Sequence, residues 1–472
     1  MNDHHIPTDT APSETGRLLH DAAERALRYL GDLDGRPVAP DEAALERLAG
    51  LGGPMPETGC DPAAVLARLD EIGGPATVAS AGPRYFGFVT GGALPAALAA
   101  NWLAGAWDQN AFSTISSPVA VALERCAIDW LLDLFGLPAG CAGALVTGAT
   151  MANATGLAAA RNAVLAEAGW DVEARGLIGA PPVTVVAGAE AHSSLFKALR
   201  LIGLGRDTAL RVPADSQGRM RPDAFPEIAG PTIVCLQAGN VNSGAFDPAD
   251  EIIPRAHHAK AWVHVDGAFG LWAAAAPGRA HLMAGYAAAD SWAVDGHKWL
   301  NVPYDSGIAL VRRPEALAAA MSVDAAYLPA GRQGNPMDYT PEASRRLRAA
   351  EVWAALAFLG RDGVADLIER TCRHAARFGQ GLRDAGFEVL NKIELNQVLV
   401  SFGPDQMTDR VIAALQAEGT CWCGRTVWHG RSAMRISVSS WATTEADVER
   451  SLDAMIRIAR AETAAAHSPD AP

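Results

Sequence analysis

The segment from Asp290 to Asn301 reads DSWAVDGHKWLN, and it decides the fold class of this chain. Its first part is apolar enough for a buried strand, and a histidine and a lysine follow directly at positions 297 and 298. Charged side chains are rarely buried without a partner. Lys298 therefore either lies in a solvated loop or belongs to a functional site, and the rest of the sequence favours the second interpretation.

A second strand-like segment, WVHVDGAFG at residues 262–270, lies upstream and places Asp266 at the end of its apolar run. Lys298 follows Asp266 by 32 residues. A lysine amine can form a Schiff base with the aldehyde of pyridoxal phosphate, and a carboxylate can keep the pyridine nitrogen of that cofactor protonated. The pair therefore indicates a pyridoxal phosphate enzyme, with a helix-capping Asp266 and a loop Lys298 as the structural alternative.

Four short motifs occur in an order and spacing that are specific in combination. They are TGATMAN at 147–153, AHSS at 191–194, HVDGA at 264–268 and DGHKW at 295–299. With them the chain resembles, from about Arg17 to about Ala461, the group II pyridoxal-phosphate-dependent amino-acid decarboxylases. That family includes the aromatic-L-amino-acid, glutamate, cysteine-sulfinate and diaminobutyrate decarboxylases. The resemblance implies the α/β fold type I of pyridoxal phosphate enzymes, with a mostly parallel seven-stranded sheet and an active site at a homodimer interface.

The composition is that of an ordinary soluble globular protein. The 472 residues are 49% hydrophobic and 19% charged, which suggests two or three domains. A net charge of −14 argues against a nucleic-acid or anionic-membrane surface. The sequence has no run of 18 uninterrupted apolar residues, so we expect no membrane-spanning helix. The polar N-terminus does not resemble a signal peptide, and the scattered cysteines favour a reducing cytoplasm. Cys421-Trp422-Cys423 alone is a weak metal signal, so we expect no metal.

Apolar strands alternate with helical patterns between residues 143 and 311, which predicts a mostly parallel sheet covered on both faces. Strands are expected at 143–147, 183–187, 232–237, 261–266, 291–295 and 307–311. The stretch from residue 31 to 62 is rich in Gly, Pro and Asp and is expected to be irregular. We expect three parts: an N-terminal tail and helical dimerisation segment at 1–80, a large cofactor-binding domain at 81–345, and a small C-terminal α+β domain at 346–472.

Gly148-Ala149-Thr150 lies between a predicted strand and a predicted helix. Small residues let backbone N–H groups approach an anion at a helix N-terminus. The resemblance makes this the cofactor phosphate site, whereas a plain strand-to-helix turn is the structural alternative. It also implies that His297 reaches the phosphate. Asp295 is not assigned as a ligand, because a carboxylate repels a phosphate.

The resemblance places His192 on the face of the pyridine ring, where an imidazole can also act as a proton donor. It places the small Ala268 against the cofactor, and Asn240 and Asn242 near the cofactor or the substrate carboxylate. An Asx-turn is the structural alternative for these two asparagines. The expected cofactor-binding residues are thus Gly148, Ala149, Thr150, His192, Asn240, Asp266, Ala268, His297 and Lys298.

In the resembling family a tyrosine on a mobile loop donates the proton to Cα. Tyr339 is the best positional match, with Tyr327 as the alternative, although the loop before Arg345 is shorter than in animal aromatic decarboxylases. The candidate substrate pocket consists of Phe86, Phe88, Thr90 and Phe112, the last from the partner subunit in one interpretation. Their aromatic character favours an apolar or aromatic substrate; Gln109 and Asn110 would instead suit a polar one. A core-packing turn is the structural alternative for Phe86 and Phe88.

The sequence thus predicts decarboxylation of an L-amino acid to its amine and carbon dioxide through a Lys298 Schiff base. The expected catalytic residues are Lys298, His192, Asp266 and Tyr339. An aldehyde synthase or a carbon–carbon lyase could use the same lysine and aspartate. A non-catalytic pyridoxal-phosphate-binding homologue is a third possibility, and the intact Lys298 and Asp266 argue against it.

Overall fold

The computed structural model describes residues 12–323 and 334–466. Its centre is a seven-stranded sheet in the order β1-β7-β6-β5-β4-β2-β3. Strand β7 runs antiparallel to both of its neighbours, and the remaining pairs are parallel. The strands are β1 Ala142–Val146, β2 Thr184–Gly188, β3 Leu210–Val212, β4 Thr232–Gln237, β5 Trp262–Asp266, β6 Ser291–Asp295 and β7 Gly307–Val311. The six predicted strands and the fold class are confirmed; the short, half-exposed edge strand β3 was not predicted.

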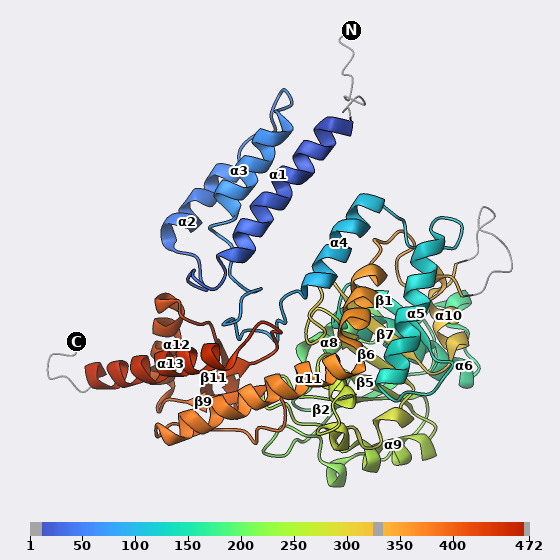
Figure 1. Cartoon of the computed structure of the whole chain (residues 1–472). Coiled ribbons are helices and arrows are strands. Elements are labelled where there is room, and N and C mark those ends of the chain that lie inside the picture. The colour runs from blue at the N-terminus through green and yellow to red at the C-terminus, as the bar shows by residue number, and fades with distance from the viewer. Residues whose placement is uncertain (1–11, 324–333, 467–472) are drawn as a thin grey trace.

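Helices cover both faces of this sheet, as the strand pattern requires (Figure 1). On one face lie α6 (Ala149–Glu167), α8 (Ser193–Leu201) and α10 (Pro314–Met321), which share an apolar cluster with the sheet. On the other face lie α5 (Pro118–Leu134), α9 (Ala249–His258) and the 3-10 turn Gly270–Ala275.

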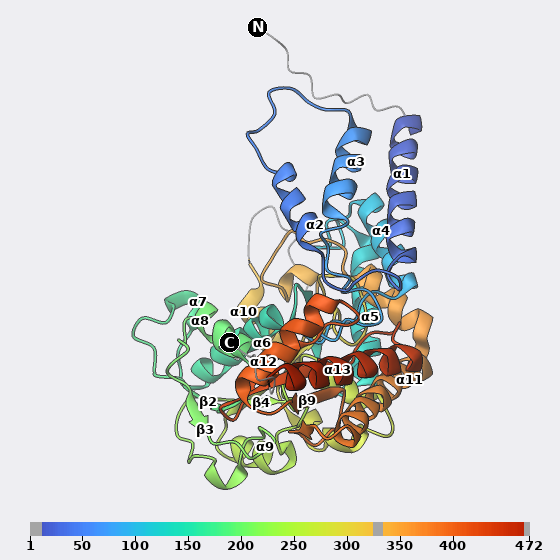
Figure 2. The ribbon, with the colours of Figure 1, turned by 90° about the vertical axis from the view of Figure 1, so that its left-hand side faces the viewer.

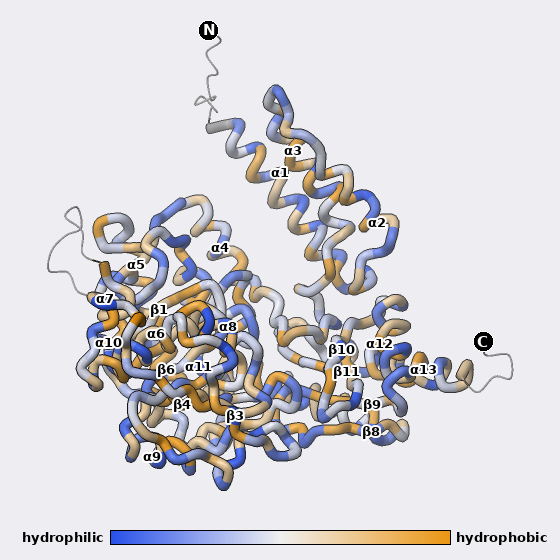
Figure 3. The backbone as a smooth tube through the Cα atoms, turned by 180° about the vertical axis from the view of Figure 1, so that it is seen from behind, coloured by the Kyte–Doolittle hydropathy of each residue, from blue (hydrophilic) through white to orange (hydrophobic). Residues whose placement is uncertain are grey.

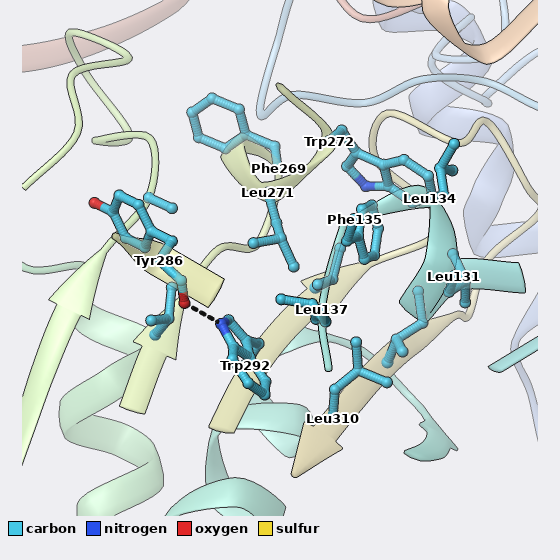
Figure 4. Close-up of a cluster of buried hydrophobic side chains, with 14 of the residues drawn as sticks. Leu131, Leu134, Phe135, Leu137, Phe269, Leu271, Trp272, Tyr286, Trp292 and Leu310 are labelled. Atoms are coloured by element: carbon cyan, nitrogen blue, oxygen red, sulfur yellow. Dashed lines mark hydrogen bonds between the residues drawn. The ribbon is translucent and has the colours of Figure 1, made fainter. Parts of the chain in front are cut away.

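The core of the second face is rich in large rings (Figure 4). Phe135 meets Trp272 edge-on, with ring centroids 4.9 Å apart, and the Trp292 indole donates a hydrogen bond to the Tyr286 carbonyl at 3.0 Å. The buried indole N–H groups are therefore satisfied inside the core. These rings fill the core between the sheet and the helices that cover this face.

A second, four-stranded antiparallel sheet forms the C-terminal part in the order β10-β11-β9-β8. Its elements are β8 Glu388–Val389, β9 Gln397–Ser401, β10 Gly424–Trp428, β11 Arg431–Ser437, α12 Asp405–Glu418 and α13 Glu445–Ala466. Helix α11 (Ala349–Asp384) contacts α5 beside the large sheet and β9 in the small one, and Gly360 breaks it with φ 60°. The boundaries predicted at residues 80 and 345 stay predictions.

The N-terminal helices stand apart from the body of the chain as an arm (Figures 1 and 2). Helices α1 (Pro12–Gly31) and α3 (Pro62–Gly73) contact each other, and Arg25 of α1 pairs with Asp70 of α3 at 3.0 Å. Figure 3 shows apolar positions among polar ones along this arm. The expectation of an irregular 31–62 segment was wrong in part, because Asp41 caps a short helix, α2 (Glu42–Arg47), by accepting the Ala44 N–H at 2.7 Å.

Helix α4 (Pro95–Trp107) follows the arm and leads into the large sheet region. Within residues 12–323 and 334–466, each helix is too short or too polar to cross a membrane.

Candidate active site

Lys298 lies in the turn that follows β6, at the edge of the sheet where the parallel strands end. Its amine is 3.1 Å from Oδ2 of Asp295, the last residue of β6, and Oδ1 of the same carboxylate is 3.5 Å from Nε2 of His297. Asp295 is buried, and burial also lowers the pKa of His297, so this imidazole is neutral near pH 7. The strand and its turn therefore hold a lysine amine beside a buried carboxylate.

The turn between β1 and α6 reaches the same place. The Ala149 N–H donates to Oδ1 of Asp295 at 2.5 Å, so the N-terminus of α6 already faces an anion. Strand β7 packs so closely against this turn that a Cβ on Gly307 would lie 2.4 Å from the Cα of Gly148. Gly148, Ala149 and Thr150 thus form the start of α6 at the sheet edge, as the phosphate-site prediction requires.

Asp266 ends β5 and is the second buried carboxylate of the site. Its Oδ2 accepts a hydrogen bond from Nδ2 of Asn153 at 3.1 Å, and its Oδ1 accepts one from the Ala268 N–H at 3.2 Å. Each oxygen keeps lone-pair capacity for a further donor. Ala268 therefore supports Asp266 through its backbone while its small side chain leaves space beside the strand end.

His192 caps α8, since its Nδ1 accepts the Ser194 N–H at 3.3 Å. Burial lowers the pKa of His192, an effect that the charge of Asp266 opposes and that Lys298 reinforces. A neutral imidazole, a carboxylate and a lysine amine thus influence one another electrostatically at one sheet edge. The structure brings together Lys298, Asp266 and His192, three of the four predicted catalytic residues.

The side-chain amide of Asn240 forms its hydrogen bonds with other groups of the protein. Its Oδ1 accepts the N–H groups of Asn242 and Ser243 at 2.9 and 3.2 Å, and its Nδ2 donates to Oε1 of Gln237 at 3.2 Å. This is the Asx-turn arrangement that was the structural alternative. A cofactor-binding role for Asn240 stays a prediction.

The predicted substrate-pocket residues are split between core and surface. Phe86 is only 1% exposed and meets Phe378 edge-on at 5.1 Å in the small-domain core, which fits the core-packing alternative. Phe88 is 62% exposed and tilts over Trp422 at 5.5 Å, and Trp422 also stacks with Tyr85 at 5.1 Å. Phe88 can therefore contact a bound molecule, whereas Phe86 holds the segment in place.

Thr90 and Phe112 lie in different surroundings. Thr90 is buried, with its Oγ1 3.3 Å from the hydroxyl of Tyr304. Phe112 is half-buried in the loop between α4 and α5, and its carbonyl accepts the Met337 N–H at 3.1 Å. A contact of Phe112 with substrate stays a prediction.

Tyr339 lies on the sheet face that α6 covers. It packs beside Met151 and lines a cavity of about 240 Å³ together with Arg125, Ile128 and Gly143. This cavity is lined by residues other than those around Lys298, so the structure adds no support for Tyr339 as the proton donor, which stays a prediction. The alternative, Tyr327, falls outside the described residues.

Two residues that sequence reasoning missed face the site. Arg435 of β11 is partly buried, it donates to the Val241 carbonyl at 3.2 Å, and its charge adds to the lowering of the pKa of His192. The described part of the chain offers it no ion-pair partner. The Tyr304 ring lies tilted against His297 with centroids 4.4 Å apart, and Tyr304 is 59% exposed. The available signals were a lone arginine in the apolar run AMRISV and a tyrosine six residues after Lys298.

These groups fit pyridoxal phosphate. Lys298 would supply the amine for the aldehyde, Asp266 a buried carboxylate with free lone pairs for the ring nitrogen, and the α6 N-terminus a cradle for the phosphate. His192 would supply a flat, neutral ring beside them. The fold and the site therefore define a fold type I pyridoxal phosphate enzyme.

Comparison with known proteins narrows this class. The family model of the pyridoxal-dependent decarboxylase conserved domain matches residues 70–403, more than half of the chain. The aromatic-L-amino-acid decarboxylase of Drosophila lebanonensis is 30% identical over 391 residues, which cover 77% of this chain and 95% of that protein. The L-2,4-diaminobutyrate decarboxylase of Rhizobium meliloti is 29% identical over 433 residues, covering 86% and 84%. The chain belongs to the pyridoxal-dependent decarboxylase family and is a pyridoxal-phosphate-dependent amino-acid decarboxylase.

Solved structures confirm the fold over nearly the whole chain. The Oryza sativa TDC structure with PLP and tryptamine has a TM-score of 0.88 at 24% identity, covering 97% of this chain and 99% of that one. The Rhodiola rosea 4-hydroxyphenylacetaldehyde synthase has a TM-score of 0.84 at 21% identity, covering 96% and 99%.

Proposed function

We propose that the protein decarboxylates an L-amino acid with an aromatic or large apolar side chain, giving the amine and carbon dioxide. The observation that carries this proposal is the group of rings near the site: Tyr85 and Phe88 against Trp422, and Tyr304 against His297. Phe88 and Tyr304 are 62% and 59% exposed, so they present ring faces that an aromatic side chain can stack on. Aromatic substrates are also named for one relative with 30% identity.

When bound, pyridoxal phosphate supplies the electron sink that carbon dioxide loss needs. Lys298 would hold it covalently, and the negative charge of Asp266 favours a protonated ring nitrogen. Arg435, a partly buried cation without a carboxylate partner among the described residues, attracts the substrate carboxylate into the site. His192, held neutral by burial, would cover the face of the cofactor ring and could move a proton at that place.

The experiment is a substrate profile of the purified enzyme loaded with pyridoxal phosphate. The twenty standard amino acids, diaminobutyrate and cysteine sulfinate are compared by carbon dioxide release, and the organic product is identified by mass spectrometry. We expect the highest kcat/KM for aromatic substrates, with the amine as product. A preference for diaminobutyrate or cysteine sulfinate would contradict the proposal.

An aldehyde-forming reaction is the second candidate, favoured by the structural likeness to an aldehyde synthase. Product analysis separates the two, because aldehyde formation consumes oxygen and releases ammonia along with carbon dioxide. The proton donor to Cα decides between the outcomes, and Tyr339, Tyr327, Tyr304 and His192 are the candidates to compare by substitution.

We also propose a homodimer with a shared active site, located in the cytoplasm. Apolar side chains are exposed along the arm and on α4: Leu19, Leu27, Leu69, Trp102, Leu103 and Trp107. A second copy would cover them, because exposed apolar surface of this kind is typical of an interface. All seven cysteines are free thiols, which suits a reducing compartment.

A further inference from the structure

A continuous chain of buried hydrogen bonds runs beneath the sheet edge and ends on Asp266. Nε1 of Trp262 lies 2.8 Å from Oγ of Ser291, which lies 2.8 Å from Nδ1 of His264. Nε2 of His264 lies 2.8 Å from Oδ1 of Asn153, and Nδ2 of Asn153 lies 3.1 Å from Oδ2 of Asp266. Three elements contribute: β5 with Trp262, His264 and Asp266, β6 with Ser291, and α6 with Asn153.

The chemistry of the groups assigns a direction to every bond. An ionised carboxylate only accepts, so Asn153 must turn its amide nitrogen to Asp266 and its oxygen to His264. An amide oxygen also only accepts, so His264 must carry a proton on Nε2. At the other end the indole only donates, so Ser291 accepts from Trp262 and has its own proton left to donate.

A neutral His264 follows from its surroundings. It is fully buried, and burial lowers its pKa to about 3. The groups that face its ring are Asn153 and Gly156 from α6 and Ser291 from β6, all of them uncharged. A Cβ on Gly156 would lie 3.0 Å from the ring, tighter than ordinary packing, so glycine at this position lets the imidazole lie against α6. With Nε2 protonated, Nδ1 is an acceptor and takes the Ser291 proton.

We propose that Asn153, His264 and Ser291 are positioning residues for Asp266. They direct the side-chain N–H of Asn153 to Oδ2 of Asp266, and the backbone N–H of Ala268 binds Oδ1. Together these two donors fix the plane of the carboxylate, which would face the ring nitrogen of the cofactor. Asn153, His264 and Ser291 are all neutral. Their hydrogen bonds therefore hold the ionised carboxylate of Asp266 without adding a charge that would compete with the ring nitrogen. This role is independent of which amino acid is the substrate.

The direct test is the tautomer of His264 in the cofactor-free protein. Nitrogen-15 NMR of histidine-labelled protein, with the signal assigned from the His264→Gln variant, should show a neutral ring with its proton on Nε2 at about pH 5, where an exposed histidine is charged. A charged ring, or a proton on Nδ1, would overturn the proposal whatever the variants do.

The second test is kinetic and spectroscopic. His264→Phe removes the link to Asn153, so we expect kcat to fall by about tenfold or more while KM stays within about twofold, by analogy with outer hydrogen-bond partners of metal ligands. The absorption maximum of the bound cofactor should also shift, because the charge partner of its ring has moved. In His264→Gln a side-chain amide can still donate to Asn153, so kcat and the absorption maximum should return most of the way to the wild-type values.

Thr155→Val is the matched control, because Thr155 is a fully buried residue of α6 whose hydroxyl has no hydrogen-bond partner. It should leave kcat and the cofactor spectrum at wild-type values. If His264→Phe fails to fold, Ser291→Ala, which removes the donor to Nδ1 together with the acceptor of the Trp262 N–H, replaces it in the comparison. A wild-type kcat and cofactor spectrum in His264→Phe, or in Ser291→Ala where it replaces His264→Phe, would refute the proposal.

Discussion

The amine of Lys298 lies 3.1 Å from Oδ2 of Asp295, and the other oxygen of that carboxylate accepts the Ala149 N–H at 2.5 Å. Both partners are groups that the cofactor would use: the amine for its aldehyde, and the start of α6 for its phosphate. Asp295 therefore places a carboxylate beside the expected phosphate position. A phosphate bound at the start of α6 would lie close to this like charge.

Asp295→Asn is expected to bind pyridoxal phosphate more tightly than the wild type does. Loss of one negative charge next to a phosphate dianion amounts to roughly a tenfold change in Kd. Titration of cofactor-free protein, followed by absorbance, measures this. Pyridoxal without its phosphate is the control ligand, and its Kd should change much less; weaker binding of pyridoxal phosphate by the variant would show that Asp295 assists the phosphate instead.

Lys298 is expected to be the residue that holds the cofactor. Borohydride reduction of the loaded enzyme should attach the cofactor permanently, and peptide mapping should find it on the peptide that contains Lys298. Lys298→Ala should lose both the label and the activity, while Lys392→Ala, at an exposed lysine between β8 and β9, keeps them. Label on a different lysine would overturn the assignment.

Asp266→Asn is expected to lower kcat by a thousandfold or more. The amide carries no charge, so the ring nitrogen loses the partner that keeps it protonated, which costs on the order of 4 kcal/mol of transition-state stabilisation. Steady-state kinetics at saturating cofactor give the value. A variant within tenfold of the wild-type kcat would place the partner of the ring nitrogen elsewhere.

His264 should make the cofactor-free protein sensitive to acid. Its pKa is about 3 in the folded chain and near 6.5 when unfolded, so below pH 6.5 the unfolded state binds the extra proton and stability falls as pH falls. Between pH 7.5 and 5 this single group is expected to remove about 2 kcal/mol. Urea unfolding of the wild type and His264→Gln at both pH values should show a smaller loss in the variant; His281→Gln on the surface is the control.

Leu27→Glu is expected to dissociate the proposed dimer. Leu27 of α1 is 66% exposed, and a carboxylate there would be buried without a partner in an interface. Sedimentation velocity at assay concentration should show a monomer with little activity. Glu24→Gln, which changes an exposed polar residue of the same helix, should remain dimeric; a fully active monomeric wild type would refute the shared site.

The strands could be predicted because β5 and β6 are continuous apolar runs that end on charged residues. That signal is local, and it located Asp266 and Lys298 at the edge of the sheet. Partners from distant segments left no such signal. The Phe86 N–H donates to the Trp422 carbonyl at 2.8 Å, a pairing that directs Phe86 into the small-domain core while Phe88 faces outward. Alternation along an extended segment would place residues 86 and 88 on the same face, and the left-handed backbone at Phe88, with φ 52°, breaks that pattern.

Arg435 and Asn153 could not be assigned for a related reason. Arg435 belongs to the small sheet and Asn153 to the helix after β1, so their proximity to the site depends on how three separate elements pack. An arginine in a strand or an asparagine in an alanine-rich helix is unremarkable in the sequence alone.

The position of β1 has a consequence for synthesis of the chain on the ribosome. Among the described strands its only neighbour is β7, and Val146 pairs with Gly307, which is translated 161 residues later (307 − 146). At ordinary rates of translation, β1 is synthesised roughly 8–30 seconds before β7 and remains unpaired during that time. The nascent chain therefore exposes an unpaired apolar strand together with the start of α6, where chaperones can bind it. The proposed phosphate site at the start of α6 is consequently completed late, after β7 has paired with β1.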